Sequence, residues 1–155
     1  MIQIKAVDAQ NVGEVCRLAA GQNCLGPAQE CSPRCNALSI AEASYRRDMH
    51  PNAIYHNHRL IGFFLYQRPE SHADTATLCR FMVDGRFRQE GLEETALEHI
   101  LRGLKIQGVK QVEARLEQEG RRSRALLLAC GFRLMEETTH TTRYVCRFET
   151  QNWRE

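Results

Sequence analysis

The chain has 155 residues, 43% of them hydrophobic, and its 21 Lys and Arg residues stand against 19 Asp and Glu residues, for a formal net charge of +2. This length and composition predict one globular domain over residues 1–155, large enough to bury a core without disulfides or a structural metal. The near-balanced charge argues against a dedicated nucleic-acid binder, because phosphate-driven affinity needs a surplus of Lys and Arg on one face.

Cysteine usage and the length of the apolar runs bear on the compartment. The seven Cys are an odd number, and no apolar leader follows Met1, so we expect reduced thiols in a cytoplasmic protein. The apolar run at 60–65 is far shorter than the ~20 residues that a membrane span needs. No membrane partner is therefore expected.

The first half of the chain predicts a strand, two helices and a hairpin. Alternation of apolar and polar residues indicates strands, spacings of three and four indicate helices, and Gly and Pro indicate loops. Asp8 is suited to cap the first helix. The expected elements are a strand at 2–7, a helix with Val12, Val15 and Leu18 on one face, a loop at 20–34, a helix at 37–46, and strands at 52–55 and 60–67 joined by a turn at 56–59.

The second half alternates strands with helices. Its most regular segment lies between Gly91 and Gly108, where Leu and Ile residues recur at helical spacing over about four turns. The expected elements are strands at 76–84, 109–116, 132–135 and 141–148, and helices at 92–107 and 122–130, the second ending at Gly131. The order β-α-α-β-β-β-α-β-α-β-β predicts a mixed α/β (α+β) domain without repeats.

Three groups of segments carry a family resemblance. They are residues 36–42 with 50–55 and 60–63, residues 80–84 (Arg-Phe-Met-Val-Asp), and residues 130–132 (Cys-Gly-Phe) after a short helix. Together they resemble the GNAT superfamily of acetyl-CoA-dependent N-acetyltransferases, nearest to its bacterial spermine/spermidine acetyltransferases. The resemblance implies a central mixed, mostly antiparallel sheet flanked by helices.

The resemblance also implies where acetyl-CoA lies. Its pantetheine arm runs along residues 81–84, paired with the backbone like an added strand, and its pyrophosphate lies at the start of the next helix, where free N–H groups and the positive end of the helix dipole meet. The implied cofactor-binding residues are Met82, Val83, Asp84, Arg88, Gln89, Glu90, Gly91, Leu92, Glu93 and Glu94.

One residue of this loop departs from the family. The pattern Gln/Arg-x-x-Gly-x-Gly/Ala is matched at Arg88 and Gly91, but Glu93 stands at the last position. A carboxylate ~4 Å from a phosphate costs on the order of 4 kcal/mol at an effective dielectric near 20, or several hundred-fold in affinity before screening. Alternatively, Glu93 merely favours a helix N-terminus, or Arg86 or Arg88 draws it aside.

The catalytic positions also depart from the family. Many members carry a Tyr, the general acid toward the CoA thiolate, where this chain has Leu127, and an Asn where it has Gly120. Leu cannot donate a proton, so the general acid is unassigned. Positioning the amine against the thioester is a part of catalysis that does not need that Tyr.

The acceptor side needs a group that attracts an ammonium and removes its proton, because an alkylamine with a pKa near 10 is almost wholly charged at neutral pH. Glu42 is the first candidate to contact the amine and Asp84 the second. The alternatives are that Glu42 is a solvated helix residue and that Asp84 caps a turn.

Several other side chains are weighed as sites. Buried or loop thiols are expected for Cys16, Cys24, Cys31 and Cys35, because zinc knuckles are usually paired, and a hairpin tip is expected for His56 and His58, so no metal is predicted. Cys130 lies beside the implied thioester end or is a small core residue. Arg115, Arg121, Arg122 and Arg124 form a basic patch near the implied adenosine phosphate or a solvated face.

Two functions remain open. The first is an N-acetyltransferase that moves acetyl from acetyl-CoA to a primary amine of a small, polyamine-like cation by direct attack on the thioester, with the backbone of residues 82–84 polarising the carbonyl. The second is a degenerate GNAT domain that binds a ligand or a protein. Family members often dimerise, so a homodimer also stays open.

Overall fold

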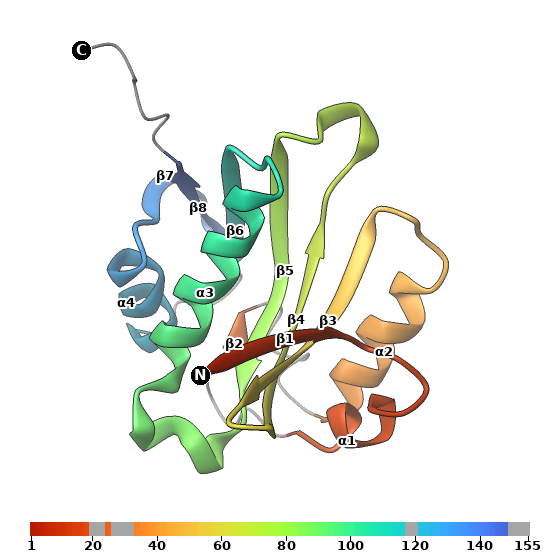
Figure 1. The fold of residues 1–155 in the computed structure, drawn as a ribbon. Coiled ribbons are helices and arrows are strands. Elements are labelled where there is room, and N and C mark those ends of the chain that lie inside the picture. The colour runs from red at the N-terminus through yellow and green to blue at the C-terminus, as the bar shows by residue number, and fades with distance from the viewer. Residues whose placement is uncertain (19–23, 26–32, 117–120, 149–155) are drawn as a thin grey trace, which may run out of the picture.

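A central sheet organises the computed structural model, which describes residues 1–18, 24–25, 33–116 and 121–148 (Figure 1). Its strands follow the order β1-β3-β4-β5-β6-β8-β7, with β2 paired to β5. Only β5 and β6 pair in parallel among the described strands. The strands are β1 (Ile2–Ala6), β2 (Cys24–Leu25), β3 (Met49–His56), β4 (Arg59–Gln67), β5 (Thr75–Val83), β6 (Gln111–Leu116), β7 (Arg133–Glu137) and β8 (Thr142–Arg147).

Helices cover both faces of this sheet. They are α1 (Val12–Cys16), α2 (Pro33–Ala43), α3 (Leu92–Ile106) and α4 (Arg121–Ala129), with short 3₁₀ turns η2 (Glu70–His72) and η3 (Gly85–Glu90). The apolar side chains of α3 and α4 pack on one face, in the cluster that includes Phe64 and Phe81. The other face is covered from α1 and α2, over Phe63 and Met82. The predicted mixed sheet flanked by helices is thus confirmed, and no described helix has the length and apolarity to span a membrane.

The largest differences from the predicted helices and strands lie in the first half of the chain. The loop expected at 20–34 contains β2. Helix α2 begins at Pro33, since proline fits the first helical position, where its missing N–H has no intrahelical partner. Strand β3 begins at Met49 and runs through Pro51, whose carbonyl oxygen accepts from the Val7 N–H at 3.1 Å just past the end of β1, so the missing proline N–H falls at the end of this ladder and not inside it.

The hairpin between β3 and β4 turns through two residues. Asn57 and His58 have φ values of 50° and 68°, the left-handed pair that a tight type I′ turn requires. Asn tolerates this region better than most residues. The predicted turn at 56–59 is thereby confirmed, and it explains His56 and His58 as hairpin residues.

Strand β5 has different neighbours along its length. On one edge β4 pairs with it as far as Val83. On the other edge β6 pairs with it only from Thr75 to Leu78. The two parallel strands therefore part after Leu78, which leaves the C-terminal half of β5 open to another partner.

The close approach of β4 to β5 depends on a glycine. A Cβ atom on Gly62 would lie 2.4 Å from the Met82 carbonyl oxygen, which is backbone and cannot move aside. Gly62 therefore sets how closely β4 holds the end of β5. Gly103 in α3 is the opposite case, because a Cβ there meets nothing within 4 Å.

These two glycines give a matched test of the packing. Gly62→Ala is expected to lower the free energy of unfolding by about 1–3 kcal/mol, since the strands must separate. Gly103→Ala is expected to raise it by about 0.5–1 kcal/mol, since alanine is the better helix former. Urea unfolding followed by circular dichroism measures both, and equal effects of the two substitutions would contradict the close approach of β4 to β5.

Candidate active site

The turn after β5 prepares a helix N-terminus. Asp84, 4% exposed, accepts hydrogen bonds from the Arg86 backbone N–H at 3.0 Å and from the Arg86 Nε at 2.9 Å, and so caps η3. Gly91 then takes φ +69° immediately before α3, and a Cβ atom added there would meet nothing within 4 Å. The alternative that Asp84 caps a turn is confirmed, and its second candidacy as an amine contact stays a prediction.

The first turn of α3 carries the acidic residues predicted for the loop. Glu93 is half-buried and Glu94 is exposed, both near the positive end of the α3 dipole, where carboxylates stabilise a helix. The Arg86 guanidinium pairs with Asp84 and lies 5.3 Å from the centroid of the Phe87 ring. The Arg88 side chain lies outside the described residues, so the suggestion that an arginine draws Glu93 aside stays a prediction.

A backbone N–H group at the end of β5 that was expected to be available already has a hydrogen-bond partner. The Asp84 N–H donates to the Ile61 carbonyl oxygen at 2.7 Å, so it is not available to polarise a thioester carbonyl. That part of the expected role of residues 82–84 is wrong. The reason is that β4 continues beside β5 to the end of the strand and takes the amide of the following residue.

The open edge of β5 is also occupied. Cys24 pairs with Met82 and Leu25 with Phe81, in antiparallel register. Because β4 holds the other edge, β2 lies on the edge that β6 leaves, and it contacts β6 as well (Figure 1). The chain itself thus pairs with two of the residues, Phe81 and Met82, along which the family resemblance places the pantetheine arm.

The two ends of the expected acetyl-CoA site therefore differ in whether they have room for the cofactor. The pyrophosphate end fits, because Gly91 leaves space at the free N–H groups of α3. The pantetheine edge does not fit while β2 is paired with β5. No catalytic step is therefore derived through the pantetheine arm.

A buried arginine ties the helices of the opposite face to β5. Arg80 is 2% exposed, and its Nη2 donates to the Asn36 Oδ1 at 2.7 Å. The Asn36 Nδ2 donates in turn to the Val15 carbonyl oxygen at 3.0 Å. Sequence reasoning gave neither Arg80 nor Asn36 a role, although a lone charge inside an apolar strand is a signal for a buried polar network.

The structure separates the proposed catalytic positions. Glu42 is exposed near the C-terminal end of α2, and Leu127 is fully buried in the core beside α3. The position of the family Tyr is therefore a packing position here. Gly120 lies outside the described residues.

Cys130 is a poor nucleophile. Burial, followed by the negative charges of Glu98 and Glu94, raises the pKa of its thiol to about 12. Burial also raises the pKa of Cys146. Both thiols therefore stay protonated at neutral pH, which favours the alternative of core residues.

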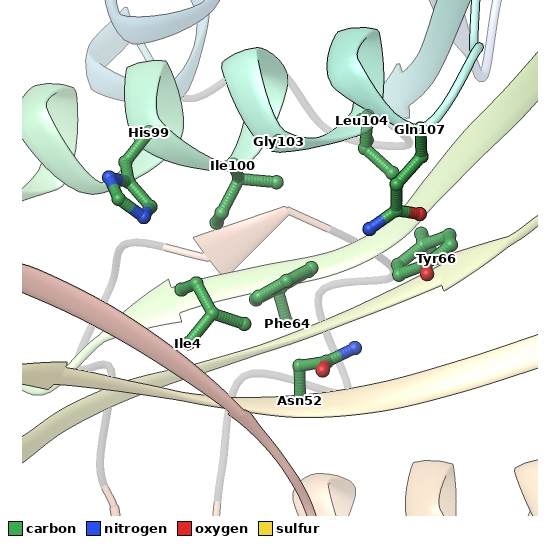
Figure 2. Close-up of a pocket in the computed structure, with 9 residues that line it drawn as sticks. All are labelled: Ile4, Asn52, Phe64, Tyr66, His99, Ile100, Gly103, Leu104 and Gln107. Atoms are coloured by element: carbon green, nitrogen blue, oxygen red, sulfur yellow. The ribbon is translucent and has the colours of Figure 1, made fainter.

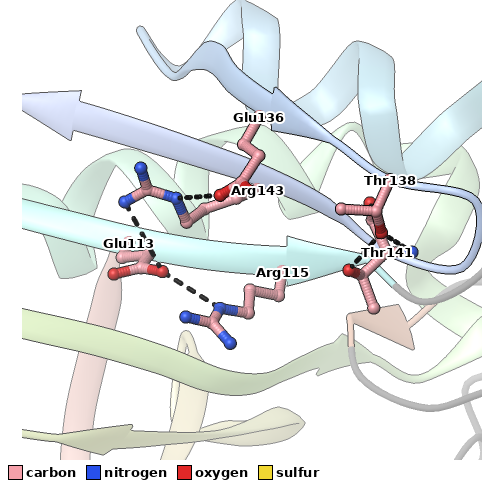
Figure 3. A network of polar contacts seen from close by, with 6 residues as sticks. All are labelled: Glu113, Arg115, Glu136, Thr138, Thr141 and Arg143. Carbon is pink, nitrogen blue, oxygen red and sulfur yellow. Dashed lines mark hydrogen bonds and ion pairs between the residues drawn. The ribbon is translucent and has the colours of Figure 1, made fainter.

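The remaining polar candidates belong to other features. Arg115 Nε donates to Glu113 Oε1 at 3.0 Å, Glu113 Oε1 lies 3.9 Å from an Arg143 nitrogen, and Arg143 lies 3.6 Å from Glu136 (Figure 3). Arg115 is thus part of an ion-pair network across β6, β8 and β7.

The other members of the predicted basic patch and the remaining cysteines are only partly described. Arg124 is exposed, and the side chains of Arg121 and Arg122 lie outside the described part of the chain. The same is true of Cys31 and of the side chains of Cys24 and Cys35. Within the described residues no three His, Cys, Asp or Glu side chains form a metal site.

A cavity of about 150 Å³ lies between α3 and the sheet (Figure 2). Phe64 and Tyr66 line it from β4, His99 lines it from α3, and Gln107 lines it from the C-cap of that helix. Burial raises the pKa of Tyr66. Its α3 lining lies in the C-terminal half of the helix, so this cavity is distinct from the helix N-terminus at Gly91.

The fold and this strand–turn–helix arrangement define the acyltransferase class known as GNAT. The family model described as the acetyltransferase (GNAT) family matches residues 8–132. The chain therefore belongs to the GNAT acetyltransferase family, whose members use acetyl-CoA. No curated protein matches the sequence significantly.

Solved structures agree on the fold. An acetyltransferase from Thermus thermophilus is similar with a TM-score of 0.75 and 17% identity, over 96% of this chain and 97% of that one. The PaiA N-acetyltransferase from Thermoplasma acidophilum, in complex with coenzyme A, gives 0.68 and 15% over 96% and 99%. The ribosomal-protein-S18-alanine N-acetyltransferase from Escherichia coli gives 0.68 and 18% over 100% and 99%.

The raised pKa of the Cys130 thiol predicts how its alkylation rate depends on pH. With the pKa raised from 9.0 to about 12, its thiolate fraction at pH 8 is expected to be about a thousandfold below that of an unstructured cysteine. Alkylation by iodoacetamide, followed by peptide mass spectrometry, should therefore be slow and should keep rising about tenfold per pH unit beyond pH 9 while the protein stays folded. A rate that levels off near pH 9 would contradict the raised pKa.

Proposed function

We propose that this protein transfers the acetyl group of acetyl-CoA to a primary amine of a small cation, polyamine-like in character, in the cytoplasm. The observation that carries the proposal is the sequence of β5, capped turn, Gly91 and α3 N-terminus within a GNAT domain. Free backbone N–H groups at a helix start bind phosphate without help from side chains. The departures from the family at Glu93 and Leu127 leave these backbone N–H groups in place.

The chemistry assigned to the acceptor rests on Glu42. It is exposed near the end of α2, the helix that Asn36 and Arg80 tie to β5, so its carboxylate is open to a cation from solvent. In the proposed reaction Glu42 attracts the ammonium and takes its proton, directly or through water. The raised pKa of Cys130 supports direct transfer to the amine rather than an acylated thiol.

The compartment and partners are proposed on similar grounds. Cys16, Cys130 and Cys146 form no disulfide, which supports a reducing compartment. The near-balanced formal charge of +2 argues against nucleic acid as a partner. Family members often dimerise, so a homodimer is included in the proposal.

Acetyl-CoA binding is the first test of the proposal. Acetyl-CoA at about 100 times its dissociation constant is expected to stabilise the native state by roughly 2.7 kcal/mol, visible as a rise in the melting temperature. Glu93→Ala is expected to tighten binding about three- to tenfold, because it removes a half-exposed negative charge near the phosphate. Glu98→Ala, an exposed residue further along α3, is the control and is expected to change little.

The outcomes separate the enzyme from the degenerate domain. Binding followed by turnover in a panel of polyamines and other amines supports the enzyme. A protein that stays folded yet binds no acetyl-CoA, with Glu93 or with Ala in its place, is the degenerate domain.

The acceptor carboxylate has its own prediction. Glu42→Gln is expected to raise the KM for a cationic amine about tenfold while leaving acetyl-CoA affinity unchanged, since it removes one charge from the acceptor side. Steady-state kinetics with spermidine as the probe, beside Glu14→Gln on α1 as an exposed control, measure this effect. Equal KM values for the two variants would remove Glu42 from the acceptor site.

A further inference from the structure

Among the described residues, the strand that pairs with the edge of β5 beyond Leu78 is β2, over two residues. Its opposite edge is paired with β4 through Val83, while Cys24 and Leu25 take the positions facing Met82 and Phe81. An added strand binds such an edge through backbone groups. The edge therefore accepts either β2 or an extended amide-bearing ligand at these positions, and not both.

Strand β5 does not depend on β2 for its own position. Phe81 and Met82 are each 2% exposed and pack into the clusters on opposite faces of the sheet. Gly62 and Phe63 of β4 remain paired with Val83 and Met82 on the other edge. Release of β2 therefore leaves a formed edge behind rather than an unravelled strand.

The chain length around β2 permits its release. Five residues separate Leu18 from Cys24, and seven separate Leu25 from Pro33. Seven residues span up to about 25 Å when extended. Asn36, held to Arg80 at 2.7 Å, is thus able to stay in place while Cys24 and Leu25 leave the edge.

We propose that β2 is an internal competitor of acyl-CoA, a two-residue strand that occupies the pantetheine edge of β5 and must leave before the arm can pair there. The inference rests on the proposed function, because it assigns regulation to that site. The measured affinity for acetyl-CoA is then the affinity of the open edge reduced by the fraction of molecules in which the edge is open.

The backbone pairing is tested by a proline pair. Successive N–H groups of a strand point to opposite edges, so one of the two in β2 faces β5, and Cys24→Pro with Leu25→Pro removes it whichever it is. Cys24→Ala with Leu25→Ala keeps both N–H groups and is the matched control. The proline pair is expected to bind acetyl-CoA about tenfold more tightly than the alanine pair, by isothermal titration calorimetry.

A second measurement follows β2 in the unmodified protein. Hydrogen exchange at residues 24–25 is expected to become faster on addition of acetyl-CoA, while exchange at residues 81–83 becomes slower, because the ligand replaces the strand. A ligand that binds without displacing β2 slows both segments or changes neither. Circular dichroism on the variants confirms that they remain folded.

The results separate this inference from the proposed function. Equal or weaker binding by the proline pair, or slower exchange at residues 24–25 with acetyl-CoA, overturns the competition while acetyl-CoA binding itself stands. Absence of acetyl-CoA binding in every folded form overturns the proposed function, and the inference falls with it. Tighter binding by the proline pair with faster exchange at 24–25 supports both.

Discussion

The parting of two parallel strands is the constraint on which the site depends. Backbone groups that lose one partner inside a protein must find another, because an unsatisfied buried N–H or C=O costs free energy. β5 and β6 pair only up to Leu78, so the remaining edge of β5 needs a substitute partner. In this chain β2 supplies it, and the same requirement makes the edge suitable for an amide-rich ligand.

The surrounding structure holds that edge in place from three directions. β4 approaches closely at Gly62, the core packs on both faces, and Arg80 ties the strand to Asn36 of α2. The turn that follows is fixed by Asp84 through the N–H of Arg86. A rigid strand end followed by a capped turn delivers the N-terminus of α3 to one place, as an anion site requires.

Periodicity predicted the elements whose burial is one-sided. The apolar face of α3 could be predicted because each residue's direction follows from its spacing. Strand β2 could not be predicted, because two residues are too few to show an alternation of apolar and polar side chains. Leu127 is predicted to be a departure from the family, but its full burial follows from α3 packing over it, a contact between segments that spacing cannot show. The Asp84 amide was misassigned because its acceptor, Ile61, lies on another strand.

The hydrogen bond between Arg80 and Asn36 also adds to the chain-entropy cost of folding. It joins residues 44 positions apart in sequence, and Asn36 reaches Val15 a further 21 positions back. Contacts of this separation close long loops, which costs chain entropy and raises the contact order of the domain. The hairpin of β3 and β4, which turns through two residues, closes a far shorter loop. The face of the sheet that carries α1 and α2 is therefore held by contacts that are entropically more costly to form than those of the hairpin.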